Sequence, residues 1–521
     1  MKTKDTNKKL RIMVFDFNSK MFIEAIKNLQ NHSVEILYWA ASKKDFMEIF
    51  NDRTLFPGTI FHDANDAAAG IPADGIETSS FEPPSNEFIE SLFECELRAL
   101  IMMENIDRTH APMMKKLHLY YLYVKYWYGV LSALKPDAII FSDVPHMSFR
   151  YVIYCLARHL GIKQVMLRNM QIGGRMFVID DFTEYKRLKK EIEINQGKNF
   201  TLNDLSPDVR DYYEKQRTTN KSPFYFRKEY SRNWQYQLHR FVPDRRSVIR
   251  NIKKFTLFKT TFLYIQMFFL KRDLPSLEKF RKPTWVIKLQ EKKYNKIKLG
   301  FKEEYVRYQI NPDYSKKYIY VPLQTQPERS TTAEGRAFID QILMIDMLSH
   351  AIPRDWVIYV KENPLQWIKS RTHIGRFKGY TKELVAMKNV RVVSTETSTF
   401  DLIKEAQAIG TVGSTAALEA VLRGKPVLVF GHTWYVFCDG MFSVSSVETC
   451  KKAIEKIQKG YKPEQQKVIN FLKAVDSTTI RAYKDIRFKK GEDLNKTYTA
   501  NDEENAETLA DAFYEELVSS K

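Results

Sequence analysis

The sequence predicts an α/β protein in which two Rossmann-like domains face a cleft, with a basic, mainly helical insertion between them. Strand-like and helix-like segments alternate over residues 1–184, and the same alternation resumes over residues 306–490. Short strand–helix–strand units of this kind form parallel sheets with right-handed crossovers. The charged residues 185–305 break this rhythm and give the insertion, and residues 491–521 add a C-terminal helix.

The first domain is predicted from short apolar runs that alternate with amphipathic segments. A long polar stretch that contains prolines follows the second run and is expected to be irregular up to about residue 86. The expected strands are 11–17, 34–39, 138–143 and 163–168, and the expected helices are 21–29, two between 87 and 134, and 149–160.

The second domain repeats the pattern with shorter units, and a last amphipathic helix is expected at 501–518. Its expected strands are 318–324, 356–361, 390–394, 408–411 and 426–430, and its expected helices are 337–348, 399–406 and 414–422.

Composition limits the class of protein. The four cysteines are dispersed without a CxxC spacing, which argues against a zinc site or a disulfide framework and fits a reducing compartment. The basic N-terminus lacks the apolar core of a signal peptide, and no run reaches the ~20 apolar residues that span a bilayer. We therefore expect a cytoplasmic protein.

The net charge of +19 is concentrated in residues 222–300, which hold 20 Lys or Arg and five Asp or Glu with interleaved aromatic residues. Three interpretations compete. The segment is a solvated helical linker, or it lies on an anionic membrane surface on the inner face of the plasma membrane, for which the apolar run 255–270 with flanking bases is suited. Nucleic acid is the least favoured partner, because no RNA-recognition or helix-turn-helix motif accompanies the charge.

The stretch GTVGSTAALEAVLRGKPVLVF, residues 410–430, predicts a turn, a short buried helix and a buried strand. Gly410 and Gly413 let the backbone turn without Cβ clashes, and Ser414 or Thr415 can cap the helix. The amide groups and the positive dipole end of such a helix favour phosphate. The alternative is an ordinary capped connection between a helix and a strand.

Ligands of open parallel sheets bind beyond the carboxyl ends of the strands, and this rule selects candidates in the second domain. The set suits a nucleotide, with amides and Lys361 on phosphate, Glu419 on ribose hydroxyls and loop backbone on the base. Each residue also has a structural alternative: a surface ion pair, a turn or an exposed helix position. The candidates are Gln326, Pro327, Glu328, Arg329 and Ser330; Lys361, Glu362, Asn363 and Pro364; Gly413, Ser414, Thr415 and Glu419; and the segments 394–399 and 431–435.

Asp143 and His146 follow the strand 138–143 of the first domain and are expected to face the cleft. Either side chain could act as general base on an acceptor hydroxyl. The alternative is a capping Asp143 and a partly buried His146. Asp16, after the first strand, is a weaker candidate of the same kind.

Several catalytic motifs are missing from the sequence: GxxxxGK[ST], GxGxxG after a strand, HExxH and GxSxG. No acidic pair of the DxD type follows a strand convincingly. We therefore expect neither ATP hydrolysis nor dinucleotide redox chemistry, no metal ligands, and no cofactor apart from a nucleotide-linked co-substrate.

At QTQPERSTTAEGRAFIDQILMIDMLSHAIPRDWVIYVKENP and at GTVGSTAALEAVLRGKPVLVFGHTWY, the sequence resembles the bacterial capsule polysaccharide biosynthesis family, related to the β-Kdo transferases of capsule assembly. FSDVPHMSFRYVIYCLARHLGIKQ is similar to part of the family's first domain. The resemblance implies a GT-B fold, a nucleotide-sugar donor such as CMP-Kdo in the second domain and a lipid-linked or polysaccharide acceptor in the first. It places the family's Gln-Pro motif on Gln326 and Pro327, and its Lys-Glu-His-Pro motif on residues 361–364.

One position departs from the family pattern. The family usually has His where this chain has Asn363, and in related enzymes that His contacts the donor phosphate. Asn363 can donate a hydrogen bond but cannot supply a proton.

The expected function is therefore a metal-independent glycosyltransferase, with Asp143 or His146 as base and Lys361 at the leaving phosphate. There are two alternatives. One is a polyol-phosphate transferase of the teichoic-acid type. The other is a non-catalytic GT-B protein that binds nucleotide or glycan as a scaffold, and Asn363 in place of the family's His favours keeping this alternative.

Overall fold

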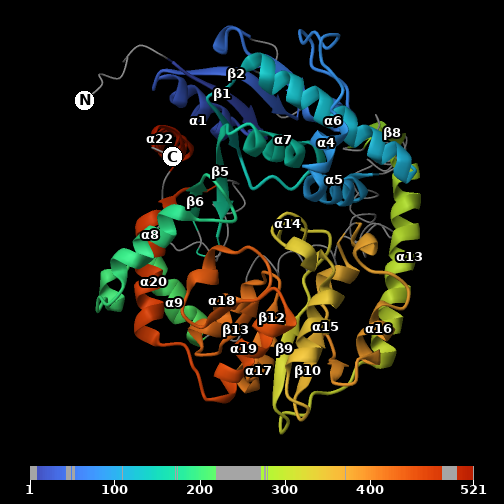
Figure 1. The fold of residues 1–521 in the computed structure, drawn as a ribbon, viewed down its shortest axis with the longest axis vertical. Coiled ribbons are helices and arrows are strands. Elements are labelled where there is room, and N and C mark those ends of the chain that lie inside the picture. Colours follow the sequence, from blue (N-terminus) through green and yellow to red (C-terminus); the bar gives the residue numbers. More distant parts are fainter. Residues whose placement is uncertain are drawn as a thin grey trace, which may run out of the picture.

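The computed structural model describes residues 9–42, 49, 53–107, 109–170, 172, 174–218, 271–274, 277, 280–369, 371–483 and 501–519. Two sheets form the cores of its two halves, one in the upper and one in the lower half of Figure 1. The predicted α/β fold with two Rossmann-like domains, a GT-B-like arrangement, is confirmed.

The first sheet has seven strands in the order β15-β6-β5-β4-β1-β2-β3. The neighbours from β3 to β5 are parallel, and β6 and β15 join antiparallel at one edge. Its strands are β1 (Leu10–Phe15), β2 (Val34–Ala41), β3 (Ile60–Asp63), β4 (Ala138–Phe141), β5 (Lys163–Asn169), β6 (Arg175–Ile179) and β15 (Ile480–Arg481).

Helices cover this sheet on both faces. The apolar faces of α1 and of the C-terminal helix α22 meet beside the sheet, where Phe17 packs edge-on against Phe513 with ring centroids 5.6 Å apart. The helices are α1 (Lys20–Gln30), α3 (Ala64–Ala68), α4 (Asn86–Glu90), α5 (Phe93–Ile106), α6 (Met113–Leu134), α7 (Ser148–His159) and α22 (Asp502–Val518), with the 3-10 turn η1 (Arg53–Leu55).

The second sheet has six strands, all parallel, in the order β11-β10-β9-β12-β13-β14. This is the doubly wound order 3-2-1-4-5-6, in which the direction of winding reverses between the first and fourth strands. Its strands are β9 (Tyr318–Pro322), β10 (Val357–Lys361), β11 (Val390–Val392), β12 (Ala408–Thr411), β13 (Val427–Val429) and β14 (Met441–Ser443).

The helices of this half have from four to 14 residues. They are α14 (Arg329–Thr332), α15 (Gln341–Ala351), α16 (Tyr380–Ala386), α17 (Thr399–Glu405), α18 (Thr415–Leu422), α19 (Val447–Gln458) and α20 (Gln465–Thr478), with 3-10 turns η3 (Arg336–Ile339), η4 (Pro364–Trp367), η5 (Thr372–Gly375) and η6 (Trp434–Phe437).

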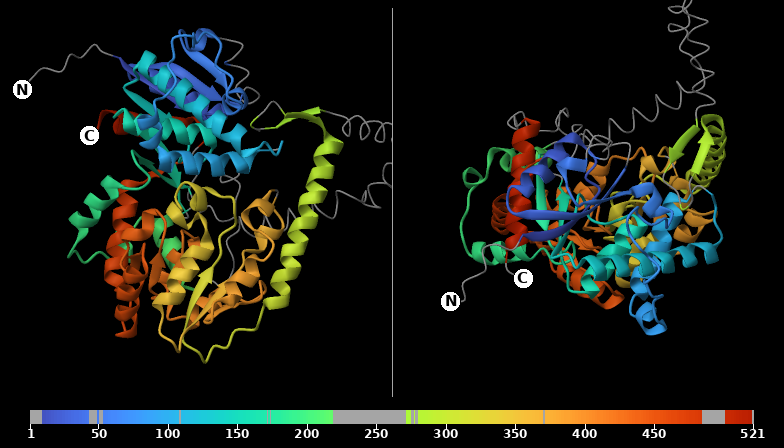
Figure 2. Two further views of the ribbon diagram at one scale, coloured as in Figure 1. Left: turned by 45° about the vertical axis from the view of Figure 1, so that its right-hand side comes forward. Right: turned by 90° about the horizontal axis from the view of Figure 1, so that it is seen from above.

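The predicted insertion, 185–305, does not form a body of its own where the structure describes it. Helix α13 runs along one side of the molecule and packs on α16, η4 and η5 of the second half (Figures 1 and 2). Helix α8 packs on α20. The elements are α8 (Lys186–Asn195), η2 (Leu202–Asp204), α9 (Pro207–Thr218), β7 (Lys271–Leu274), β8 (Phe280–Pro283) and α13 (Thr284–Tyr308).

Two segments cross back from the second half to the first. Residues 480–481 were expected to belong to the second domain, but they form the strand β15, which pairs with β6 of the first sheet, and α22 docks on α1. Of the strongly basic residues 222–300, the structure describes 271–274, 277 and 280–300, so the predicted membrane contact of 255–270 lies outside the described residues.

Candidate functional site

The reversal point of the second sheet lies between β9 and β12, which pair in parallel through Ile319 and Tyr320. In open α/β sheets the ligand crevice lies beyond the carboxyl ends of the strands at this point. The loops that leave this edge carry most of the sequence-predicted residues. These loops are 323–328 after β9, 362–364 after β10, 393–398 after β11, 412–414 after β12 and 430–433 after β13.

Gln324 ties two of these loops together. Its Oε1 accepts a hydrogen bond from the Gly413 amide at 2.9 Å, and its Nε2 donates to Ser330 Oγ at 2.9 Å. Gln324 is buried and crosses directly from the end of β9 to the loop before α18. Sequence reasoning missed this residue, although its place at the carboxyl end of β9 was a signal for it.

The N-terminus of α18 is half-exposed, as a phosphate site requires. Ser414 is the N-cap and accepts a hydrogen bond from the Ala416 amide, while Thr415 is the first helical residue. The two glycines serve close packing: a Cβ on Gly410 would lie 2.7 Å from Leu348 Cδ1, and one on Gly413 would lie 3.0 Å from Thr433 Cγ2. The loop is therefore fixed in place before any ligand arrives.

Lys361 ends β10 and is 8% exposed. Its ammonium donates to the carbonyl of Thr397 and, at 3.0 Å, to Thr399 Oγ1, so it links the β10 and β11 loops. Burial lowers the pKa of Lys361 to about 8, against the opposing effect of Glu396. The residue is a cation whose charge responds to pH near neutrality.

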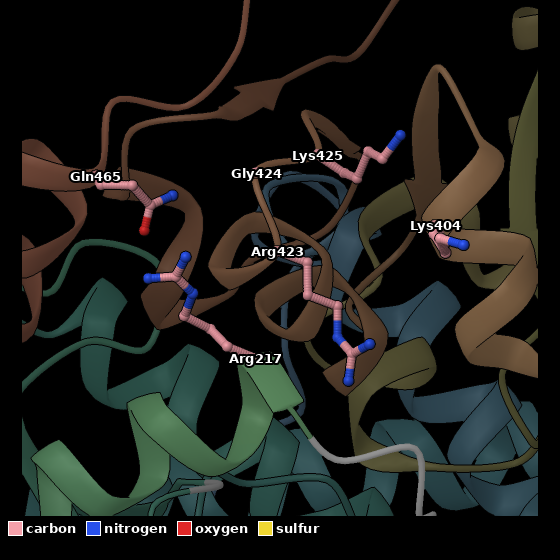
Figure 3. A pocket seen from close by; sticks show the side chains of 6 residues that line it. All are labelled: Arg217, Lys404, Arg423, Gly424, Lys425 and Gln465. Carbon is pink, nitrogen blue, oxygen red and sulfur yellow. The ribbon is translucent and has the colours of Figure 1, made fainter.

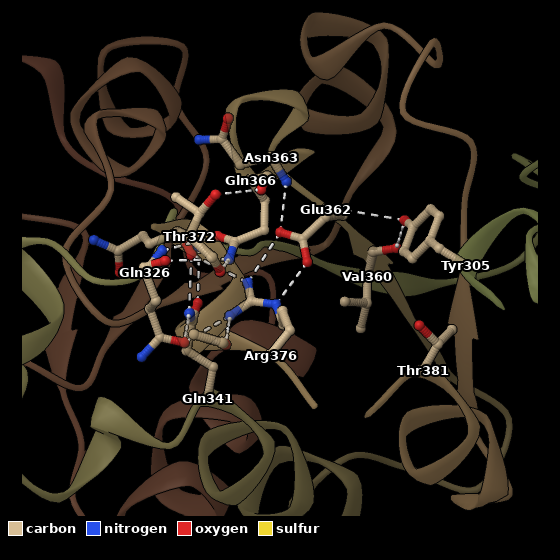
Figure 4. Close-up of polar contacts among 12 residues, drawn as sticks. Tyr305, Gln326, Gln341, Val360, Glu362, Asn363, Gln366, Thr372, Arg376 and Thr381 are labelled. Carbon is tan, nitrogen blue, oxygen red and sulfur yellow. Dashed lines mark hydrogen bonds and ion pairs between the residues drawn. The ribbon is translucent and has the colours of Figure 1, made fainter. Parts of the chain in front are cut away.

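Gln326 and Glu362 are engaged within the protein (Figure 4). The Glu362 carboxylate receives two hydrogen bonds from Arg376, at 2.7 and 2.9 Å, and both side chains are 1% exposed. Arg376 also donates to Gln326 Oε1 at 2.7 Å, and Gln326 N donates to Gln366 Oε1 at 2.8 Å. In this structure these side chains hold the β9 and β10 loops together.

Asn363 takes a local role beside this network. Its Oδ1 accepts the Leu365 amide at 3.0 Å, so it caps the turn η4, in which Pro364 is the first residue. On the β9 loop, Pro327 follows Gln326, and Glu328 accepts a hydrogen bond from Lys369 at 2.8 Å.

Glu419 lies on the buried side of α18 and is 5% exposed. Burial raises its pKa to about 7, and Arg423 opposes that shift. The predicted contact of Glu419 with ribose hydroxyls needs an exposed carboxylate, whereas in this structure residues 416–422 of α18 are all buried.

Charged pairs join the two halves of the molecule. Arg168, at the end of β5, forms a two-point ion pair with Glu334, with distances of 2.8 and 3.0 Å, and both side chains are buried. Arg329 of α14 lies 2.6 Å from Asp143 Oδ1. Burial opposes the charge of Arg329, but Asp143 and Glu334 raise its pKa above the usual range.

The predicted bases therefore differ in their surroundings. Asp143 forms an ion pair with Arg329, so its carboxylate is engaged in this structure. His146 Nδ1 lies 2.8 Å from the carbonyl of Val144, which can only accept, so Nδ1 carries the proton and a neutral ring keeps its lone pair on Nε2. Asp16 forms an ion pair with Arg150.

Three further residues at this edge were not among the predicted ligands, or were named only as part of a segment. Glu334 accepts a hydrogen bond from the His432 amide at 2.7 Å through its carbonyl. Burial lowers the pKa of His432 to about 4, so its ring is neutral at physiological pH. The Tyr435 hydroxyl donates to the Ser414 carbonyl at 2.8 Å and steadies the start of α18.

Among the described residues, no cluster of three or more His, Cys, Asp or Glu side chains is arranged to hold a metal ion. Within the same ranges, no helix combines the length and apolarity needed to cross a bilayer.

Residues 258–458 match the family model described as "Capsule polysaccharide biosynthesis protein". The resemblance drawn from the two quoted motifs is confirmed for this part of the chain, which contains the whole β9–β14 sheet. The match also begins earlier than the motifs, within the segment predicted as an insertion. No curated protein sequence matches the chain.

Similar solved structures include two KpsC structures from Thermosulfurimonas dismutans. The one titled beta Kdo 2,7 transferase is 11% identical, with a TM-score of 0.32 over 67% of this chain and 79% of that chain. The one titled beta Kdo 2,4 transferase is 10% identical, with a TM-score of 0.28 over 65% of this chain and 79% of that chain. The UDP-GlcNAc 2-epimerase from Methanocaldococcus jannaschii is 12% identical, with a TM-score of 0.22 over 86% of this chain and 92% of that chain. These structures superpose only in part, and the fold assignment stands on the strand pairing of the molecule itself.

Proposed function

We propose that the protein is a glycosyltransferase of capsule polysaccharide biosynthesis that takes a sugar from a nucleotide donor. The family match over 258–458 supports this class. One observation carries the proposal. The half-exposed N-terminus of α18 and the buried Lys361 both lie at the carboxyl edge of the second sheet, where the reversal point is. CMP-Kdo is the first donor to test, and a lipid-linked or polysaccharide hydroxyl is the acceptor.

The donor phosphate would lie at the start of α18, beside the Ser414 and Thr415 amides. Helix N-termini favour anions through their unpaired amides and dipole. Lys361 would add a full positive charge to stabilise the leaving phosphate, which needs no metal ion. Gln324 and Tyr435 would keep the loop in the geometry that receives the phosphate, since both bond to it directly.

His146 would deprotonate the acceptor hydroxyl, because the Val144 carbonyl fixes the ring with Nε2 as the basic nitrogen. Asp143 would serve only after Arg329 moves away from it. Replacement of His146 by Gln should therefore remove transfer and leave donor binding intact.

A screen of nucleotides by thermal shift tests the donor site directly. CMP, CDP, UDP, GDP and ADP are compared on the wild type and on Lys361→Ala. A nucleotide at 100 times its dissociation constant stabilises the folded state by about 2.7 kcal/mol, which raises the melting temperature measurably. We expect one nucleotide to stabilise the wild type and to have a much smaller effect on the variant.

A non-catalytic scaffold is the second candidate, and two observations favour it. Asn363 stands where the family has His, and the Asp143 carboxylate is occupied by Arg329. Nucleotide binding without turnover of any sugar donor would support this role. Transfer of a polyol phosphate rather than a sugar would instead support the teichoic-acid type of enzyme.

The affinity for the nucleotide should fall as pH rises through about 8. The pKa of Lys361 lies near 8, so its ammonium is charged below this pH and neutral above it. A terminal phosphate is already fully ionised there, because its second pKa is about 6. We expect a loss of about tenfold between about pH 7 and pH 9.5, measured by titration calorimetry. The Lys361→Met variant should bind the nucleotide weakly, and its affinity should not change with pH in this range. An equal change of affinity with pH in the variant and the wild type would contradict this role of Lys361.

A further inference from the structure

A pocket in the second half of the molecule is lined by basic side chains (Figure 3). We propose that it binds a phosphate-bearing anion that carries at least two negative charges, as a lipid headgroup or as a free phosphate compound. The site is a pocket of about 400 Å³. It is lined by Arg217, Lys404, Arg423, Gly424, Lys425 and Gln465.

The pocket lies at the opposite edge of the second sheet from the donor loops. Helix α18 starts beside Ser414 and ends at Leu422, immediately before Arg423. An eight-residue helix is about 12 Å long, which sets the distance between its two ends. Lys425 leads into the amino end of β13, and Lys404 precedes the amino end of β12. The usual ligand crevice of such a sheet is at the carboxyl edge, so this pocket is a separate site.

Its cations come from three elements that are far apart in the sequence. Arg217 belongs to the last turn of α9, Lys404 to the last turn of α17, and Arg423 and Lys425 to the turn between α18 and β13. None of the described residues that line the pocket is acidic. A charged but purely solvated surface has no reason to gather four cations around one hollow.

Contacts with neighbouring groups hold three of these side chains in place, whereas Lys404 is largely exposed. Lys425 Nζ donates to the carbonyl of Ala406 at 2.9 Å, and the Arg423 guanidinium lies 4.8 Å from the centre of the Phe400 ring. On the other side, Arg217 donates to the Tyr213 hydroxyl at 2.7 Å. Tyr213 in turn donates to Gln465 Oε1 at 2.8 Å. A pocket whose cations are already ordered loses less entropy when an anion binds.

The positive charges also carry an electrostatic cost that an anion would relieve. Burial lowers the pKa of Arg423 and of Lys425, so both are charged in partly desolvated positions. Glu419 and Glu405 oppose these shifts only in part, and Lys462 adds to the shift of Lys425. A bound anion would favour the charged forms of both side chains.

The number and type of cations favour phosphate over a single carboxylate. Two guanidinium groups and two ammonium groups surround the hollow, and guanidinium groups bind phosphate oxygens in pairs. Lys404 already lies 3.4 Å from Glu405 Oε1, and a phosphate group with two charges compensates more of the remaining positive charge than one carboxylate does. The volume equals that of roughly a dozen water molecules at ~30 Å³ each, which is room for a diphosphate with some of its hydration.

Titration calorimetry with inorganic diphosphate tests the site. The donor site also attracts phosphate, so every measurement is made in the Lys361→Ala background as well as in the wild type. Two charge-removing variants address the pocket. One is Arg423→Gln with Lys425→Gln, and the other is Arg217→Gln with Lys404→Gln, whose side chains are exposed. The matched control is Lys451→Gln with Lys459→Gln, which removes the same charge from the exposed face and end of α19.

We expect each pocket variant to weaken diphosphate binding at least tenfold, while the control and Lys361→Ala retain it. Flotation with phosphatidylglycerol vesicles, compared with phosphatidylcholine vesicles, then identifies the source. Loss of flotation in the pocket variants alone assigns the pocket to a lipid headgroup. Equal flotation with lost diphosphate binding assigns it to a free phosphate compound. The proposal is overturned if the pocket variants bind both diphosphate and vesicles like the control, or if the wild type binds neither.

Discussion

Replacement of both Ser414 and Thr415 by Asp should abolish nucleotide binding while the fold survives. The two new carboxylates would lie where the donor phosphate is proposed to bind. Each like-charge contact at about 4 Å costs between about 1 and 4 kcal/mol, depending on exposure, so the pair should weaken binding at least about thirtyfold. Calorimetric titration with the nucleotide found in the screen measures the loss.

The variant should remain folded, because Asp caps a helix as well as Ser does and acidic residues stabilise the first turn. The matched control is Ser414→Asn with Thr415→Asn, which has nearly the same shape without the charge. We expect the control to retain most of the affinity. Equal nucleotide affinity of the Asp variant and the wild type would show that the phosphate does not bind at α18. Loss of affinity in both variants would indicate that side-chain shape, rather than charge, causes the loss.

Replacement of Arg376 by Met should lower the free energy of unfolding by about 3–5 kcal/mol. It leaves Glu362 buried without the partner that neutralises it, and a buried charge stripped of its partner is costly. It also removes the hydrogen bonds from Arg376 to Gln326 Oε1 and to the Gln324 carbonyl. Chemical denaturation, with the midpoint and slope compared between variants, measures the change.

An exposed ion pair of the same length is the control. Lys452 and Glu448 are 2.7 Å apart on α19, with side chains about 70% exposed, and Lys452→Met should cost less than about 1 kcal/mol. Adding Glu362→Gln to Arg376→Met should recover part of the loss, because the unpaired charge is then gone. If Arg376→Met costs no more than Lys452→Met, the buried pair does not stabilise the donor loops.

Local patterns predicted most of the fold. Apolar runs gave the strands β1, β2, β4 and β5 and the strands from β9 to β13, mostly to within one or two residues, because a buried strand or an amphipathic helix reveals itself through its own periodicity. The short strands β3, β6 and β14 were missed. They have three to five residues, as the predicted strands from β9 to β13 also do, so strand length alone does not separate the two groups.

The site could be predicted only in part. The rule that ligands bind at strand carboxyl ends selected, from sequence, loops that do lie together at the carboxyl edge of the second sheet, since it depends on strand order along the chain. Their internal contacts could not be predicted. Arg376, which pairs with Glu362, lies on a segment with no catalytic pattern, and Arg168, which pairs with Glu334, is in the other half of the molecule.

The division between the two levels follows from the range of the interactions. Strands, helix caps and the turn before α18 depend on residues a few positions apart, so a short stretch of sequence is enough to predict them. Other features depend on residues from 14 to more than 180 positions apart. These are the ion pairs of Glu362 and Asp143 with arginines, the burial of Glu419, and the pocket lined by four cations. Such contacts form only when the sheets fold and bring distant segments together, and they decide which polar side chains hold the structure and which can meet a ligand.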